Sequence, residues 1–243
     1  KDCSSFWAGF PAAQVNEEFV QTERPLQPVR KIVIKGAVDV FFKRASVPRL
    51  MVAGNTQEAI KAVKTTLKDD RLVIENHGFS INFGASGGVH YSTGAGAIHI
   101  GSIGGSLMVN GKKVFVNENE VGRAVVGIEL PDIPSLAIKG SGAVTLLDLQ
   151  QAGIEIEISG SGSVVAGGHV AALNVLISGS GDVDARTLIA HQAHLSISGA
   201  GDIRARASDS VLVQISGCGD VVVHGNPPNR RKLISGCGEV RFK

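Results

Sequence analysis

Ile158-Ser159-Gly160-Ser161-Gly162 is the stretch that decides the fold, because the chain contains it, with small variations, six times. The other copies begin at Ile138, Ile177, Ile197, Ile215 and Ile234, so that successive copies start 20, 19, 20, 18 and 19 residues apart. A repeat of this length is typical of a solenoid, in which one unit cannot bury its apolar face alone and stacks on its neighbours.

Apolar residues alternate on both sides of each glycine triplet. Ile154, Ile156 and Ile158 precede one triplet, and Val183 and Ala185 follow another. This period of two is that of a half-buried strand. We expect the glycines to allow positive backbone dihedrals and close approach of chain to chain, so that the strand turns a sharp corner. One coil is then a strand, a corner, a second strand and a looser return.

The sequence therefore predicts an all-β protein, a parallel β-solenoid similar to a right-handed β-helix, with coils of about 19 residues. The predicted corner glycines are Gly140, Gly142, Gly160, Gly162, Gly179, Gly181, Gly199, Gly201, Gly217, Gly219, Gly236 and Gly238.

Two other solenoids fit less well. Calcium-binding nonapeptide rolls place Asp two residues after a glycine and have two glycine-rich turns per coil, whereas Asp182, Asp202 and Asp220 follow the glycine directly, once per coil. A left-handed hexapeptide helix needs aliphatic residues every six positions in regular coils. The varying coil length and the alternation with a period of two argue against it.

The chain divides into three predicted parts. Residues 1–28 form an N-terminal arm or cap, residues 29–136 an irregular half of the solenoid, and residues 137–243 the regular half. The irregular half contains a glycine-rich insertion at about 77–119. We expect Phe6, Trp7 and Phe10 to plug one end of the solenoid, because an open end exposes apolar core and unpaired backbone.

Three local patterns lie in the irregular half. The segment 34–40, centred on Gly36, looks like a degenerate copy of the repeat and could be the first rung. Ile60, Val63 and Leu67 have helical spacing, which predicts a short helix within 57–67. Asn110-Gly111 stands between two apolar runs in 107–116, which predicts a hairpin that projects from the solenoid or covers an edge.

Composition excludes several classes of function. The net charge is only +2 and no basic stripe with interleaved aromatic residues is present, which argues against nucleic-acid binding. No apolar run approaches the roughly 20 residues of a membrane span. The sequence does not begin with a signal peptide, so we expect that any such segment has been removed. Cys3 could be a free thiol, an intermolecular partner or a lipid-modified cysteine.

The candidate site residues are an acidic row and a cysteine pair. Asp182, Asp202, Asp220 and Glu239 occupy one repeat position, so adjacent coils should stack their carboxylates. The row could hold a cation, supply an acid and a base for glycan cleavage, or cap the corner by accepting amide hydrogens. Capping is the interpretation we favour.

Cys218 and Cys237 occupy the centres of successive corners, within reach of a disulfide. The equivalent positions hold Ser141, Ser161, Ser180 and Ala200, so a small side chain alone would also satisfy the corner.

No other arrangement indicates catalysis, a metal or a cofactor. His191 and His194 stand three residues apart but have no third ligand nearby in the sequence. We find no Ser-His-Asp order, phosphate loop or Cys-x-x-Cys pair, and the Gly-Ser-Gly triplets lack the strand-turn-helix context of a nucleophile elbow.

The opening strand with Gly36 and Val38-Asp39-Val40, the strand that ends in Leu130-Pro131, and the glycine-serine-glycine series resemble the bacterial family called putative autotransporter adhesin, head GIN domain. The resemblance covers roughly residues 29–243. It implies a parallel β-solenoid, an envelope or surface location, and a role in adhesion. The family has no established catalytic residues to transfer.

Three hypotheses for function follow. We favour a secreted, periplasmic or outer-surface binding module without enzymatic activity, which attaches to a surface glycan or protein through its flat sheet faces and the insertion. The second is a polysaccharide-active enzyme of the pectin-lyase-like type that uses Asp182, Asp202 and Asp220. The third is a structural envelope protein that self-associates through sheet edges. A homo-oligomer is possible by analogy with adhesins.

Overall fold

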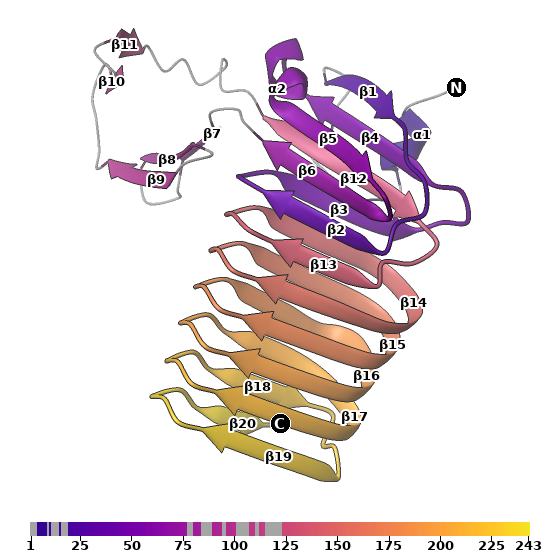
Figure 1. Ribbon diagram of the computed structural model, residues 1–243, viewed down its shortest axis with the longest axis vertical. Helices are drawn as coiled ribbons and strands as arrows, with labels where there is room; N and C mark the ends of the chain where they lie inside the picture. Colours follow the sequence, from indigo (N-terminus) through magenta and orange to yellow (C-terminus); the bar gives the residue numbers. More distant parts are fainter. Residues whose placement is uncertain are drawn as a thin grey trace.

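The computed structural model describes residues 4–8, 10, 15, 19–76, 80–83, 89–93, 96–100, 107–109, 112–114 and 123–243 (Figure 1). The predicted parallel β-solenoid is confirmed: it has about five turns, and strands account for 64% of the protein. The strands of the regular half are β13 (Ser135–Ile138), β14 (Ala143–Ile158), β15 (Ser163–Ile177), β16 (Asp182–Ile197), β17 (Ile203–Ile215), β18 (Val221–His224), β19 (Asn229–Ile234) and β20 (Val240–Phe242).

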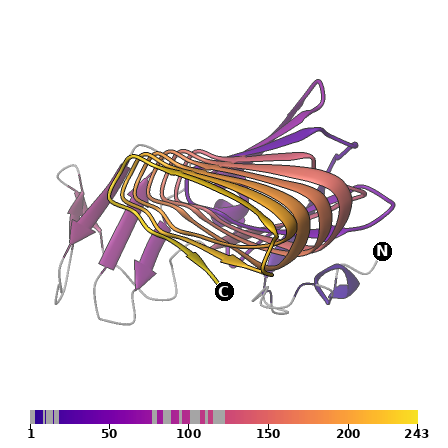
Figure 2. The same cartoon turned by 90° about the horizontal axis from the view of Figure 1, so that it is seen from below.

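Two parallel sheets enclose the core. The long strands β14 to β17 bend around one edge of the flattened coil and so contribute to both sheets, as the end-on view shows (Figure 2). We call the sheet that leads into the corners the entry sheet and the sheet that leaves them the exit sheet. The leading isoleucines are in register along the entry sheet, from Ile138 to Ile234. Inward-facing residues of both sheets form one continuous apolar cluster.

The corner glycines are needed for close stacking. A Cβ added at Gly199 would overlap the carbonyl oxygen of Gly179 in the preceding coil, and the equivalent overlap recurs at the other first glycines of the triplets. None of the twelve predicted corner glycines lies in the left-handed region, whereas Gly36 does, with φ +81°. The predicted close approach is therefore present, but none of the twelve glycines has the positive φ that we expected, which occurs at Gly36 and, outside the corners, at Gly168 and Gly225.

The segment around Gly36 is not the first rung. β2 (Lys31–Lys35) and β3 (Asp39–Arg44) flank Gly36 and pair with β13 and β14 on one side. On the other side they pair with β6 (Arg71–Asn76) and β12 (Ala124–Leu130), which form a further rung beyond them. The first solenoid strands in the sequence are thus second in space, because later segments stack outside them.

The insertion replaces a corner. In the rung formed by β6 and β12 the chain leaves the entry sheet after Asn76 and joins the exit sheet at Ala124, where the other rungs have a short turn. Within the insertion the structure describes β7 (Ser80–Phe83), β8 (Val89–Thr93), β9 (Gly96–Ile100), β10 (Leu107–Val109) and β11 (Lys112–Val114). β10 and β11 form the predicted antiparallel hairpin, while Asn110 and Gly111 lie outside the described residues.

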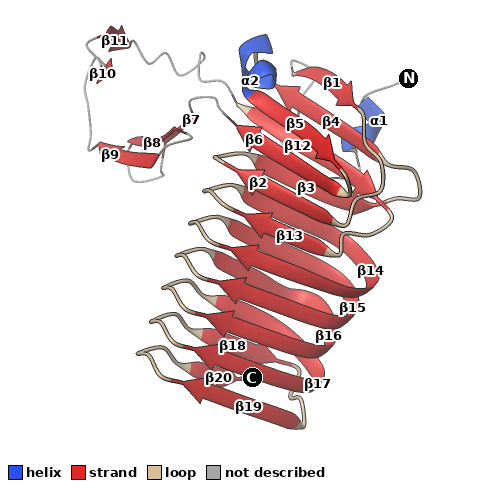
Figure 3. Cartoon of the chain, in the orientation of Figure 1, coloured by secondary structure: helices blue, strands red, loops and turns tan. Residues whose placement is uncertain are grey.

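Antiparallel strands and a helix close the N-terminal end. β4 (Arg49–Gly54) pairs with β12 and β1 (Val20–Arg24) with β4, while β5 (Val63–Lys68) pairs with β6, all antiparallel. The predicted helix within 57–67 is shorter than expected. α2 (Gln57–Ala62) begins after the Thr56 side chain, whose oxygen accepts the amide of Ala59 at 3.1 Å, and Val63 and Leu67 belong to β5 (Figure 3).

The prediction that Phe6, Trp7 and Phe10 plug the end of the solenoid is wrong. They belong to a separate cluster with Phe41, Met51, Ala53 and Val125, which are the outward-facing residues of β3, β4 and β12. The segment with α1 (Ser4–Trp7) therefore covers the outer side of the exit sheet. Gly127 on β12 leaves the space that the rings of Phe6 and Trp7 fill. The three strands thus bury both of their faces, which agrees with their continuous apolar runs, such as Leu50 to Ala53.

The C-terminal end is closed by different means. By register, Arg230 and Lys232 of β19 stand in the inward columns of Val211 and Val213. The Arg230 guanidinium lies 4.5 Å from the ring centroid of Phe242, and its Nε donates to the Pro227 carbonyl at 2.8 Å. Charged side chains in the inward columns make the end unsuitable for another apolar coil. No described helix is long and apolar enough to span a membrane.

Candidate functional site

The acidic row stacks as its spacing implies. Asp182, Asp202, Asp220 and Glu239 each follow a corner, and each of the three aspartates binds the next coil. Oδ1 of Asp182 accepts the backbone amide of Asp202 at 2.8 Å, and the same bond, also 2.8 Å, joins Asp202 to Asp220 and Asp220 to Glu239. One oxygen of each aspartate therefore satisfies the backbone of the following corner.

Asp39 occupies the same column at the opposite end. It is in register with Ala143, which is in register with Ser163 and so with Asp182. Burial raises the pKa of Asp39, and the charge of Arg123 opposes that shift. The hydrogen bond from Arg241, together with its charge, lowers the pKa of Glu239. Within the part of the chain that is described, no group of three or more His, Cys, Asp or Glu residues could hold a metal ion.

The two corner cysteines are bonded. Cys218 and Cys237 have their sulfur atoms 2.01 Å apart and their Cα atoms 4.6 Å apart. The bond ties the last corner to the one before it, so the final coil is covalently attached to the stack. Cys3 lies outside the described residues.

The two histidines three residues apart do not share a ligand. His194 Nε2 lies 2.7 Å from Oε1 of Gln214, and His191 Nδ1 lies 3.4 Å from Oγ of Ser208. Each ring thus engages a different side chain of β17. This arrangement gives no support to a metal site at the pair.

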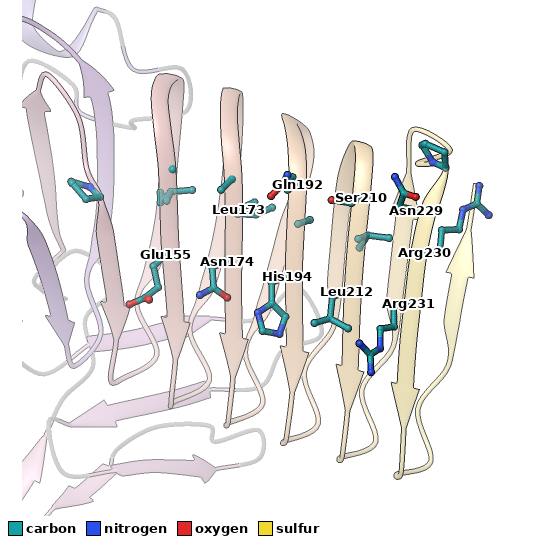
Figure 4. Close-up of a pocket in the computed structure, with 17 residues that line it drawn as sticks. Glu155, Leu173, Asn174, Gln192, His194, Ser210, Leu212, Asn229, Arg230 and Arg231 are labelled. Atoms are coloured by element: carbon teal, nitrogen blue, oxygen red, sulfur yellow. The ribbon is translucent and has the colours of Figure 1, made fainter.

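An open groove of about 950 Å³ crosses the entry sheet, perpendicular to its strands (Figure 4). It extends over the segments of five successive strands. Its outward side chains form two parallel rows. The first, which we call the groove row, is Glu155, Asn174, His194, Leu212 and Arg231. The second contains Gln192, Ser210 and Asn229.

Most outward side chains of the groove are polar. Amide, imidazole and hydroxyl groups recur at the strand spacing of about 4.8 Å and can donate to or accept from an extended ligand. A row of exposed serine hydroxyls runs parallel to the groove row: Ser159, Ser178, Ser198, Ser216 and Ser235. Charge is confined to the two ends, with Glu155 at one and Arg231 at the other.

The sequence did not predict the groove. Each member of the groove row stands three residues before the leading isoleucine of its copy, but the five side chains have no chemistry in common. The repeated glycines and aspartates are recognisable because they are similar from copy to copy. A binding row on a solenoid has no such requirement, since each side chain meets a different part of the ligand.

Comparison with known families matches residues 29–227 to the model described as putative auto-transporter adhesin, head GIN domain. The chain belongs to this family. The match confirms the resemblance seen in the sequence. No match was found among curated proteins.

A solved structure has the same fold. A putative adhesin from Bacteroides fragilis NCTC 9343 is similar over 94% of this chain and 98% of its own, with a TM-score of 0.61 and 16% identity. A putative adhesin from Parabacteroides distasonis ATCC 8503 covers 93% of this chain and 97% of its own, with a TM-score of 0.46 and 14% identity. At this level of identity the first likeness establishes the fold of the head GIN domain and no more.

The family match ends before the last coil. β19 and β20, Cys237 and the cationic residues from Arg230 onward lie beyond residue 227. The disulfide therefore joins the matched part of the head GIN domain to a final coil outside the match.

Proposed function

We propose that this head GIN domain protein is a non-enzymatic interaction module that binds a surface glycan or protein along the groove of its entry sheet. The observation that carries the proposal is the groove itself, in which polar side chains from five stacked strands face one open channel. Hydrogen-bonded strands hold these side chains at fixed spacing. Binding of a ligand therefore costs little conformational entropy at the site.

The geometry of the acidic row favours binding over glycan cleavage. Glycosidases need two free carboxyl groups on either side of the scissile bond, one of them protonated. Here Asp182, Asp202 and Asp220 each use one oxygen to bond the backbone of the next coil. Glu239 is paired with Arg241 at 2.6 Å, which holds its carboxyl in the ionised form.

A surface or extracellular location fits the disulfide as well as the family. Disulfides persist in oxidising compartments and are rare in the cytosol. The Cys218–Cys237 bond joins two exposed corners, where a cytosolic reductant would reach it. We therefore place the protein outside the cytosol, in the envelope or beyond it.

The test is binding of the purified chain to an array of bacterial and host glycans and matrix proteins, with calcium and with chelator. We expect saturable binding to one ligand class, without release of cleaved product. His194→Ala should weaken that binding. His169→Ala is the matched control, since His169 is an exposed histidine outside the groove whose Nδ1 contacts Gln150 at 3.0 Å.

Three outcomes would decide against the proposal. No binding on the array would favour a structural role, and equal effects of His194→Ala and His169→Ala would place the site elsewhere. Product formation that disappears when Asp202 and Asp220 are both changed to Asn would favour the enzyme. If binding is lost in chelator, the acidic row gains a role as a cation site.

A further inference from the structure

We infer that the last coil makes the C-terminal end of the groove an anion-binding site, so that the ligand is an acidic glycan. This inference rests on the proposed function and specifies its ligand. Its first support is the distribution of charge. The chain has 24 Lys and Arg against 22 Asp and Glu, yet residues 226–243 contain five of the cations and only one of the acids. The cations are Arg230, Arg231, Lys232, Arg241 and Lys243.

Most of these cations have no anionic partner. Arg241 pairs with Glu239 at 2.6 Å, but none of the ion pairs between described residues includes Arg230, Arg231, Lys232 or Lys243. Arg231 is exposed on the flat face and ends the groove row beside Leu212. Arg230 is at the same end but stands in an inward column, and its guanidinium packs on Phe242 at the end of the core (Figure 4). An anion at this end of the groove would therefore meet the guanidinium of Arg231, which forms no ion pair with a described residue.

The site is also held in place. Arg230, which precedes Arg231 in β19, stacks on Phe242, donates to the Pro227 carbonyl and donates a further hydrogen bond to Asn226, so the backbone that carries Arg231 is fixed. The six-residue pairing of β19 with β17 and the Cys218–Cys237 bond fix the coil beneath. Arginine binds carboxylate, sulfate and phosphate with paired N–H donors, so a positioned guanidinium selects for acidic groups.

The neighbouring residues identify the anion as part of a glycan. Asn229, Ser210 and Gln192 lie next to the arginines in the groove and offer amide and hydroxyl groups, which suit the hydroxyls of a sugar. The other end of the groove carries Glu155, so a uniformly anionic polymer such as nucleic acid would be repelled there. A mainly neutral glycan with an acidic sugar at one end would place its anion beside Arg231 and a neutral sugar beside Glu155.

The experiment measures binding of the full oxidised chain to four immobilised polymers: dextran with sparse carboxymethyl groups, dextran with sparse sulfate groups, neutral dextran and poly-glutamate. We expect binding to an acidic glycan that weakens when NaCl is raised to about 0.5 M. Arg231→Gln should weaken it about tenfold, and Arg231→Lys less, because lysine keeps the charge but loses the paired donors. A preference between the carboxylated and the sulfated polymer identifies the acid group.

Arg71→Gln is the matched control, because Arg71 is exposed and lies in the same column of the entry sheet at the opposite end. It should leave binding unchanged. Equal binding to neutral dextran, or equal loss in Arg71→Gln and Arg231→Gln, would overturn the inference while leaving a glycan-binding function intact. Equal binding to poly-glutamate would also overturn it, because charge alone would then suffice. Binding to none of the four, together with a blank array, would count against the proposed function itself.

Discussion

The two ends of this solenoid protect the edge of the parallel stack in different ways. At the N-terminal end, antiparallel strands β4 and β5 pair with the last parallel rung, and α2 joins them. At the C-terminal end charged side chains occupy inward columns of β19 instead. The first arrangement covers the edge of the parallel stack and the second makes it polar, and both oppose the addition of another parallel coil.

The two ends also differ in the side chains that they expose. The covered end is built from buried apolar residues such as Ile60 and Val63. The polar end adjoins the groove and leaves its cations exposed.

The largest expected effect comes from breaking the stack between the ends. In Gly199→Ala the new methyl group would meet the backbone oxygens of Gly179 and Ser178, which cannot move without opening the corner. We expect a loss of about 3 kcal/mol in the free energy of unfolding, measured by urea denaturation. Gly153→Ala is the control, because its Cβ would lie 3.4 Å from the nearest atom, an ordinary contact.

A loss smaller than about 1 kcal/mol in Gly199→Ala would show that the corners can relax. The two ends would then be joined by a flexible stack, and a groove formed by five coils could not act as one rigid site. Equal losses in both alanine variants would show that the close contact with the preceding corner is not the cause, because the entropy of the unfolded chain by itself favours alanine over glycine.

Removal of the disulfide should affect the C-terminal end alone. The bond closes a loop of 19 residues, for which the loop-entropy model gives a contribution of about 3 kcal/mol. In a variant with both Cys218→Ala and Cys237→Ala we expect amide protons of β19 to exchange faster while those of β4 keep their protection. Hydrogen exchange resolved by residue measures this. Uniform loss of protection at both ends would show that the solenoid unfolds as one unit.

A half-buried arginine provides the equivalent test at the N-terminal end. Arg24 donates to the carbonyl oxygens of Val63 at 2.6 Å and Ile60 at 2.9 Å, which joins β1 to the end of α2. Arg24→Met leaves both oxygens without this donor, and we expect a loss of about 2 kcal/mol in urea denaturation. Arg30→Met is the control, because Arg30 is exposed and forms only a surface pair with Asp70 at 3.9 Å. Equal losses of stability in Arg24→Met and Arg30→Met would show that the two hydrogen bonds of Arg24 do not stabilise the N-terminal end.

The sequence predicted the regular half well because stacking imposes the same requirement on every coil. The leading isoleucines and the corner glycines recur since each must fit the coil before it, and repetition makes such a requirement visible. The closures of the two ends occur once each. Nothing in the sequence around Gly36 shows that β6 and β12 stack outside it, and the aromatic residues at 6, 7 and 10 fit a plug as well as an outer cover.

The candidate site was only partly predictable for the same reason. The acidic row was visible because Asp recurs at one position of the repeat, and its bonds to the backbone explain that recurrence. The groove row was not visible, since Glu155, Asn174, His194, Leu212 and Arg231 share a position but no chemistry. Residues that hold the coils together are alike, whereas residues that meet a ligand differ.

The smallest expected effect concerns the two end members of the column that contains the acidic row. Asp39 lies near the covered end and Glu239 at the polar end. Burial raises the pKa of Asp39, so the native state holds its proton more tightly than the unfolded chain does. Stability is therefore lost as pH rises from the ordinary value of 3.8 through the raised pKa. Asp39→Asn removes that loss, and we expect a variant more stable than the parent at pH 7, with an advantage that vanishes in acid.

Glu239 should behave in the opposite way. Its bond with Arg241 lowers its pKa, so the stability it contributes is present above the ordinary value of 4.5 and is lost as pH falls through the lowered pKa. Glu239→Gln should be slightly less stable than the parent at pH 7 and equal to it in acid, with a small effect because the pair is exposed. Urea denaturation of both variants between about pH 3 and pH 7 compares the two ends directly. If both profiles shift in the same direction, the environment of the column does not differ between the covered end and the polar end.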